Sequence, residues 1–211
     1  MKTSYSEITP YIRELAEQSC RNNHIQPEMY AEHNVNRGLR DMNGNGVVTG
    51  LTEISYIKAK EKLSDGTAVP CQGQLYYRGI NIRDIVSGFM KDGRYGFEET
   101  VYLLLFSELP TRAQLDRFTQ ELSEYRSLPT SFVRDMILKA PSKDIMNKLG
   151  RSVLALYSYD EFAEESSLES ELRKAVYIIA RMPTMMVNAY QAKIGHYDNK
   201  STYFHPVRPG E

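Results

Sequence analysis

The 211-residue sequence has no tryptophan, only two cysteines and almost no net charge. Cys20 and Cys71 are far apart and form no CxxC pair, so neither a disulfide framework nor a thiolate zinc site is predicted. The 26 lysines and arginines nearly balance the 27 aspartates and glutamates. Without a net positive charge there is no general attraction for polyanions. We therefore expect no nucleic-acid partner and no anionic membrane surface.

Long apolar runs are also missing. Met1 to Arg13 is polar and lacks the apolar stretch of a secretion signal. No segment approaches the roughly 20 apolar residues that a membrane-spanning helix needs. Together with the low cysteine content, these absences predict a soluble, cytoplasmic protein.

Helical periodicity dominates what is present. Residues 5–19 carry an apolar stripe on an otherwise charged segment, which predicts an amphipathic N-terminal arm. After Gly79 the pattern is helical almost to the end of the chain. The predicted helices lie near residues 81–90, 97–108, 112–126, 131–139, 144–158 and 168–194. Pro183 should kink the last helix without ending it, because its apolar pattern continues on both sides.

Hydroxyl side chains mark the expected helix starts. Thr111 with Gln114, and Ser166 with Glu169, fit the capping box, in which the first residue caps the helix and the last one caps it in return. The segments Leu128-Pro129-Thr130 and Pro141-Ser142 are expected to end loops in the same way.

A small β element is predicted ahead of the helices. The pattern predicts two short strands, Val47 to Ile57 and Gln74 to Tyr77, separated by the polar segment 58–73. Residues 34–46 predict a loop, and the segment HYDNKSTYFHPVRPGE an exposed tail. The predicted fold class is mainly α, a multihelical bundle with a two-stranded β element. Its predicted parts are a helical arm over residues 1–36 and a helical domain over residues 37–211.

The segment from Asp41 to Gly46, DMNGNG, resembles the first half of a calcium loop, with oxygen ligands at alternate positions and glycine at the sixth. The twelfth position, which requires a bidentate carboxylate, is Thr52, and Glu53 lies one residue too far along. A tight turn with glycine at positive φ is the favoured interpretation.

No other constellation predicts a reaction. The histidines His24, His33, His196 and His205 lack metal-binding spacing, and the phosphate-binding and nucleophile motifs are absent. Four acidic residues precede the last helix, where carboxylates stabilise a helix N-terminus and keep the loop solvated. They are Asp160, Glu161, Glu164 and Glu165. The methionines Met182, Met185 and Met186 are expected to fill the core. No catalytic residue, metal ligand or cofactor is predicted, and cofactor-binding residues stay unassigned.

Three phrases resemble the citrate synthase family. GVVTGLTEISYI followed by GQLYYRGINIRDIV is similar to its N-terminal strands, with Tyr77-Arg78-Gly79 as the YRG turn. GFEETVYLLLFSELPTRAQLDRF is similar to its helix pair joined at a Leu-Pro-Thr cap. The segment Arg181 to Thr184, followed by Tyr190 and Gly195, is similar to its (K/R)xPT helix. The resemblance covers about Val47 to Gly195 and implies a fold of the citrate synthase large-domain type.

The resemblance implies a reaction in which acetyl-CoA condenses with oxaloacetate to give citrate and CoA. In that family an aspartate removes a methyl proton while two histidines assist, and those residues lie in later segments that match nothing here. His196 and His205 do not match those motifs. We therefore expect an acyltransferase fragment that is inactive alone. A homodimer is expected through the helices near 144–158 and 168–194, together with contacts to the remainder of the enzyme's chain.

Two alternatives remain open at this stage. A 2-methylcitrate synthase, which takes propionyl-CoA, has the same features in this part of the chain. A non-catalytic helical interaction or dimerisation module could also keep this fold without the chemistry.

Overall fold

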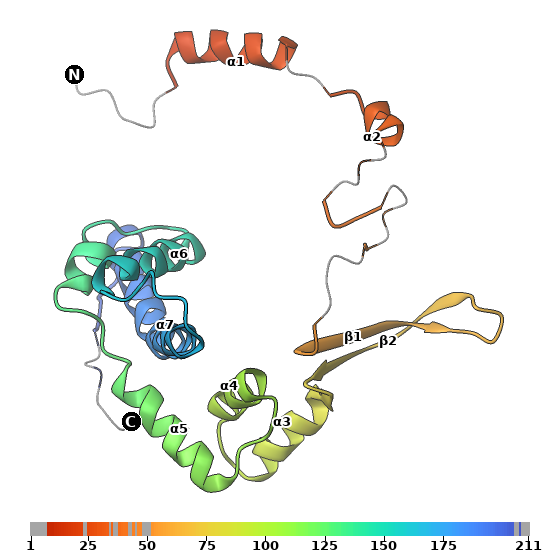
Figure 1. The fold of residues 1–211 in the computed structure, drawn as a ribbon. Helices are drawn as coiled ribbons and strands as arrows, with labels where there is room; N and C mark the ends of the chain where they lie inside the picture. The colour runs from red at the N-terminus through yellow and green to blue at the C-terminus, as the bar shows by residue number, and fades with distance from the viewer. Residues whose placement is uncertain are drawn as a thin grey trace. The chain divides into compact units, whose positions relative to one another are not determined.

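The computed structural model describes residues 8–22, 25–33, 35, 38–41, 44, 46–47, 52–204 and 207. Internal contacts divide the chain into two units, Met1–Thr52 and Glu53–Glu211 (Figure 1). The predicted boundary between residues 36 and 37 stays a prediction. None of the described helices is long and apolar enough to cross a membrane.

The first unit contains α1 (Pro10–Asn22) and α2 (Glu28–Glu32). Thr9 starts α1, since its Oγ1 accepts a hydrogen bond from the amide of Ile12 at 3.3 Å. The predicted arm is thus a helix, although it begins five residues later than expected. Its apolar stripe is exposed, and no side chain of α1 or α2 is buried.

The loop from Asp41 to Gly46 contains a tight turn in its described part. Gly44 has a φ of +79°, and its amide donates to the Asp41 carbonyl at 3.0 Å. Arg40 and Gly46 form an isolated antiparallel bridge across it. Glycine thus supplies the positive φ, as expected. Met42, Asn43 and Asn45 lie outside the described residues.

The second unit opens with an antiparallel sheet of order β1-β2-β3. The strands are β1 (Ser55–Lys62), β2 (Ala68–Tyr77) and β3 (Ile80–Asn81). The prediction placed the strands at 47–57 and 74–77, and residues 48–51 of the first lie outside the described residues. Within the described part the strand bounds were wrong, because the polar segment between the predicted strands forms most of a long hairpin. The hairpin closes through Gly66, whose φ is +84°, and through Asp65, whose Oδ1 accepts from the Thr67 amide at 2.8 Å.

The YRG turn joins β2 to β3. Arg78 and Gly79 both have positive φ, at 47° and 81°. Arg78 then reaches out of the turn, and its Nε and Nη2 donate to the carbonyl oxygen of Leu104 at 3.2 and 2.8 Å. Leu104 lies near the end of the second helix after the sheet, so the turn holds that helix end in place.

The helices that follow are α3 (Ile82–Lys91), α4 (Phe97–Phe106), α5 (Arg112–Glu124), α6 (Ile145–Leu156) and α7 (Leu168–Tyr197). A π-helix, η1 (Val133–Leu138), precedes α6, and a short 3₁₀ turn, η2 (Tyr157–Tyr159), follows it. The mainly α class is confirmed. As predicted, α7 continues through Pro183; the expected kink stays a prediction.

The segment predicted as an α-helix over 131–139 is a π-helix, which is a correction. In a π-helix each carbonyl accepts from the amide five residues later. For Met136 that residue is Pro141, which has no N–H. The ammonium group of Lys148 on α6 donates to Met136 instead, and also to the carbonyl of Ala140 at 3.0 Å.

Helix starts follow the predicted chemistry only in part. No side chain caps η1, so the prediction that Thr130 caps this helix was wrong. Thr111 and Gln114 form the predicted capping box. Ser167, rather than Ser166, caps α7 by accepting from the Ser170 amide, so no box with Glu169 forms. Asp144, rather than Ser142, caps α6. At α6 and α7 the helix has the expected kind of cap, but a neighbouring oxygen-bearing side chain accepts from the backbone N–H groups of the first turn.

The main core lies among η1, α6 and α7. Its buried residues are Phe132, Ile137, Leu149, Leu156, Met185, Ala189 and Ala192. A second cluster joins α4 to α5, where Phe118 meets Tyr102 and Phe106 edge-on at centroid distances of 5.5 and 5.9 Å. The aromatic cluster fixes α4 relative to α5. The main core fixes α6 relative to α7.

Residues 198–204, which follow α7, are exposed as predicted, but they are attached to the helix. His196 and Tyr197, predicted as the start of the tail, belong to α7. The Tyr203 amide donates to Gln191 Oε1 at 3.0 Å. A Cβ placed on Gly195 would lie 2.4 Å from the Thr202 methyl carbon. Glycine therefore allows the chain to pass closely over the end of α7.

Candidate functional site

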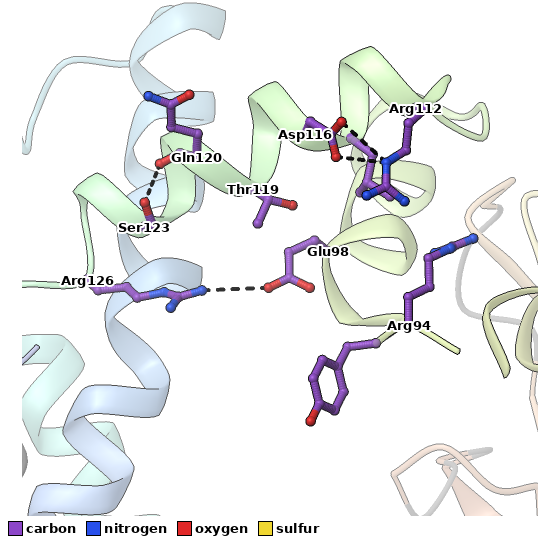
Figure 2. Close-up of a pocket in the computed structure, with 10 residues that line it drawn as sticks. Arg94, Glu98, Arg112, Asp116, Thr119, Gln120, Ser123 and Arg126 are labelled. Carbon is purple, nitrogen blue, oxygen red and sulfur yellow. Dashed lines mark hydrogen bonds and ion pairs between the residues drawn. The ribbon is translucent and has the colours of Figure 1, made fainter. Parts of the chain in front are cut away.

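The main candidate site is a groove between the start of α4 and the outer face of α5, with a volume of about 730 Å³ (Figure 2). Its described lining is rich in charged and polar side chains. These residues are Arg94, Tyr95, Glu98, Arg112, Leu115, Asp116, Thr119, Gln120, Ser123 and Arg126. None of them is a histidine or a cysteine. None of these residues carries a functional pattern in the sequence.

Each of the three arginines faces a carboxylate. Arg94 binds Glu99 in a bidentate pair with N–O distances of 2.8 and 2.9 Å, which raises the pKa of the Arg94 guanidinium. Arg112 Nε lies 3.0 Å from Asp116. The groove therefore carries many charges but little net charge, and it is not a strong anion site.

The third pair closes the groove from one helix to the other. Figure 2 shows Glu98 on α4 and Arg126, just after α5, pointing toward one another. Arg126 Nη2 lies 3.7 Å from Glu98 Oε1. This separation is longer than a direct hydrogen bond, so the two groups form an ion pair across the groove. The chemistry available is polar binding, because the described lining of the groove has no nucleophile with an adjacent histidine.

The RMPT segment of α7, Arg181 to Thr184, holds the connection that follows α5 at this groove. Arg181 Nε donates to the Ser127 carbonyl and Thr184 Oγ1 to the Arg126 carbonyl, both at 3.1 Å. The two donors flank Pro183 and hold consecutive carbonyls of the connection after α5. Through the backbone of Arg126 they also hold the guanidinium that meets Glu98.

A second pocket of about 320 Å³ lies between the end of α6 and α7. Tyr177 in its wall has the guanidinium carbons of Arg173 and Arg181 at 5.3 and 5.0 Å from its ring centre. The Tyr125 ring lies 4.3 Å from it, centre to centre. Hydrogen bonding to Glu121, and then to Tyr177, raises the pKa of Tyr125 to about 12. These contacts hold the end of α5 against α7.

The acidic segment before α7 is engaged in structural contacts. Asp160 pairs with Arg173 at 3.0 Å, and this hydrogen bond lowers the pKa of the Asp160 carboxyl. The hydroxyl of Tyr157 donates to Glu164. The backbone carbonyl of Glu165 accepts from Lys174 at 2.8 Å. The interpretation of these acids as structural is consistent with this arrangement.

The other singled-out residues are dispersed. His196 lines an open pocket at the end of α7, and its ring meets Tyr197 edge-on. His24 and His205 lie outside the described residues, and His33 is exposed. Met185 is in the core and Met182 packs against it, but Met186 is half exposed, so the core prediction was wrong for Met186. No three described His, Cys, Asp or Glu side chains are grouped closely enough to hold a metal ion.

Comparisons with known proteins point to one family. Residues 41–207 match the family described as "Citrate synthase, C-terminal domain". The chain is 30% identical over 163 residues to the citrate synthase of Saccharolobus solfataricus, covering 77% of this chain and 37% of that protein. It is 33% identical over 103 residues to 2-methylcitrate synthase 1 of Corynebacterium glutamicum, covering 49% and 21%.

Solved structures agree with the sequence comparisons. The chain is similar to the crystal structure of citrate synthase from Pyrobaculum aerophilum, with a TM-score of 0.54 and 25% identity, covering 71% of this chain and 35% of that one. The chain thus spans little more than a third, or less, of the length of these relatives.

Proposed function

Because the chain belongs to the citrate synthase family, we propose that it contributes part of the large helical domain of an enzyme that condenses acetyl-CoA with oxaloacetate. The match of residues 41–207 to the family carries the proposal, since it includes the sheet, the helices from α3 to α7 and the connections between them. The activity is an acyl transfer that yields citrate and CoA. Such a reaction belongs to the tricarboxylic acid cycle. We propose a cytoplasmic location, in keeping with the low cysteine content.

We infer that these 211 residues do not catalyse the condensation by themselves. Removal of a proton from a methyl group next to a thioester needs a positioned base, and the enolate needs a positioned donor. In the family, these are an aspartate and two histidines on segments that match no part of this chain. The arginine-rich groove between α4 and α5 has no histidine among its described lining residues.

The role of this part of the enzyme is therefore positional. Arg78 holds the end of α4 through the Leu104 carbonyl. Arg181 and Thr184 hold the connection after α5. These contacts come from the two phrases, YRG and RMPT, that carry the resemblance. A rigid helical layer of this kind supports a cleft that must exclude water during carbon–carbon bond formation.

We also propose that the chain forms a homodimer through α6 and α7. Both helices carry large apolar side chains on the surface: Met146, Leu154, Leu168, Leu172, Met186, Val187 and Tyr190. Leu154 and Leu168 are 76% and 82% exposed, and exposed large apolar side chains on two helices in contact favour an interaction surface. Replacing Leu154 with glutamate should give monomers in light scattering after gel filtration, whereas replacing the exposed Tyr95 with glutamate should not.

Thiol release tests the proposed reaction. The product of the full-length gene and this 211-residue chain are compared for intact mass and for CoA release with oxaloacetate and either acetyl-CoA or propionyl-CoA. We expect release only from a longer product. Preference for propionyl-CoA would identify a 2-methylcitrate synthase, a possibility favoured by the similarity to the Corynebacterium glutamicum protein.

Two results would contradict the proposal. CoA release by the 211-residue chain alone would refute its inactivity. If the gene encodes only these residues and no thiol is released, the synthase assignment fails, and the chain is a non-catalytic interaction or dimerisation module with this fold.

A further inference from the structure

A pocket of about 450 Å³ lies at the C-terminal end of α7. Three parts of the chain line it: the end of η1 with the turn after it, the last turns of α7, and the segment that follows α7. Its apolar lining residues are Leu138, Pro141, Ala192 and Phe204. Ala192 belongs to the main core, so the packing of α7 fixes this side of the pocket.

The chain turns back after α7 and supplies the polar side of the pocket. Asn199 has a φ of +51°, and the amides of Asp198 and Lys200 both donate to the carbonyl of Ile194, at 3.1 and 3.2 Å. A residue with positive φ after the last turn is a common way for a helix to end and the chain to change direction. The polar lining residues are His196, Lys200, Ser201 and Thr202.

Carboxylates of the described residues do not balance the positive charge at this pocket. None of the described lining residues is acidic, and Asp198 is paired with Lys193 at 2.5 Å. No described residue forms an ion pair with the exposed Lys200. Lys143 adds positive charge nearby, since its ammonium lies 5.3 Å from the centre of the Tyr197 ring. This end of α7 therefore favours an anion over a cation.

We propose that this pocket binds a small amphiphilic anion, namely an alkyl chain of medium length that ends in a carboxylate. The ammonium of Lys200 and the hydroxyls of Ser201 and Thr202 bind the carboxylate, while the alkyl chain covers the apolar lining. The volume suits such a ligand, since small-molecule pockets of about 300–1,000 Å³ combine an apolar lining with a few polar groups.

The site is separate from the others in this chain. It shares no lining residue with the groove between α4 and α5, and none of the residues proposed for dimerisation lines it. It also does not depend on the proposed condensation reaction, so its test is independent of that reaction.

Calorimetric titration of octanoate into the 211-residue chain tests the proposal. We expect saturable binding of one molecule per chain, and the binding should weaken with salt. Octanamide has the same alkyl chain without the charge and should bind about fivefold more weakly, because an exposed ion pair contributes modestly. Hexanoate should also bind more weakly, by up to about fourfold for each methylene that loses its apolar contact.

Matched variants locate the ligand. Lys200→Gln should weaken octanoate binding about fivefold and remove the preference over octanamide. Lys91→Gln removes the same charge from an exposed position at the end of α3 and should leave the affinity unchanged. Leu138→Ser reduces the apolar lining, so it should weaken octanoate and octanamide equally. Unaltered circular dichroism shows that the variants fold.

Four results would overturn the proposal: no saturable binding of octanoate, equal affinity for octanamide, unchanged affinity in Lys200→Gln, or equal losses in Lys200→Gln and Lys91→Gln. The last result would mean that octanoate responds to the net charge of the chain and not to this pocket.

Discussion

Replacement of Lys148 by methionine tests the explanation of the π-helix. Lys148 is only 2% exposed, and its ammonium group donates to the carbonyls of Met136 and Ala140. No carboxylate of the described residues pairs with its ammonium group, so two backbone carbonyl dipoles provide the compensation for burial. Methionine is similar in length and flexibility but offers no donor.

The expected loss of stability follows from those two contacts. Hydrogen bonds from a charged donor contribute about 1.5–3 kcal/mol each, and an unsatisfied buried carbonyl costs about 1–3 kcal/mol. Burial of the ammonium charge is itself unfavourable. Methionine avoids this desolvation cost, which offsets part of the stability lost with the hydrogen bonds. We expect a net decrease of about 2–3 kcal/mol in the free energy of unfolding. For a chain of this size that is a fall in Tm of about 4–12 °C.

The same replacement should change the pH dependence of stability. Burial, and then the charge of Arg151, lowers the pKa of Lys148 below its ordinary value of 10.5. Between the lowered pKa and 10.5 the unfolded state binds more protons than the folded state, so the stability of the native chain rises with pH. Below that window both states are protonated and the full cost of burying the charge applies. The methionine variant lacks this rise.

Urea unfolding followed by circular dichroism, repeated from pH 8 upward, measures both effects. Lys200→Met is the matched control, since Lys200 is exposed and should change stability by no more than about 0.5 kcal/mol. Equal stability of the Lys148 and Lys200 variants, or identical pH profiles for the native chain and the Lys148 variant, would refute the role of Lys148.

Further substitutions test other contacts, all read by urea unfolding. Thr184→Val removes the hydrogen bond to the Arg126 carbonyl and should cost about 1 kcal/mol, whereas Thr184→Ser should retain most of it; equal losses would contradict the contact. Gly79→Ala places a side chain at a φ of +81° and should cost about 1 kcal/mol or more; no loss would argue against that turn. Phe132→Ala should cost about 3–5 kcal/mol because Phe132 is fully buried, and a loss below 1 kcal/mol would place it outside the core.

The helices were largely predictable because their signals are local. A capping side chain acts within three residues, and apolar spacing reports which face is buried. Thr111 was therefore identified correctly. Where two candidates are adjacent, as at Ser166 and Ser167, small backbone differences decide which one caps. The order of the residues does not show that difference.

The hairpin was missed although its pattern was present. Tyr56, Lys58 and Lys60 alternate with Ile57 and Ala59, which is the two-residue period of a strand. The polar character of the segment suggested a loop. An exposed two-stranded ribbon needs no apolar face as continuous as that of a core strand, so composition was a poor guide here.

In the candidate groove, too, contacts within one helix can be predicted from sequence, whereas contacts between helices cannot. The pair Arg112–Asp116 is separated by four residues on one helix and can be expected from spacing alone. Arg126–Glu98 joins two helices and depends on how α4 packs against α5. Sequence spacing carries no signal for that contact, because Glu98 and Arg126 come together only after both helices have formed.

The order of amino acids alone was sufficient for the mainly α class, the helix positions, the passage of α7 through Pro183 and the family resemblance, since each depends on residues within a few turns of one another. Only the tertiary structure decided that Arg78 holds α4, that Arg181 and Thr184 hold the end of α5, and that Lys148 completes a π-helix. Each of these side chains donates to a backbone carbonyl of a distant segment. Every residue carries such a carbonyl, so only the packed fold determines which one lies within reach.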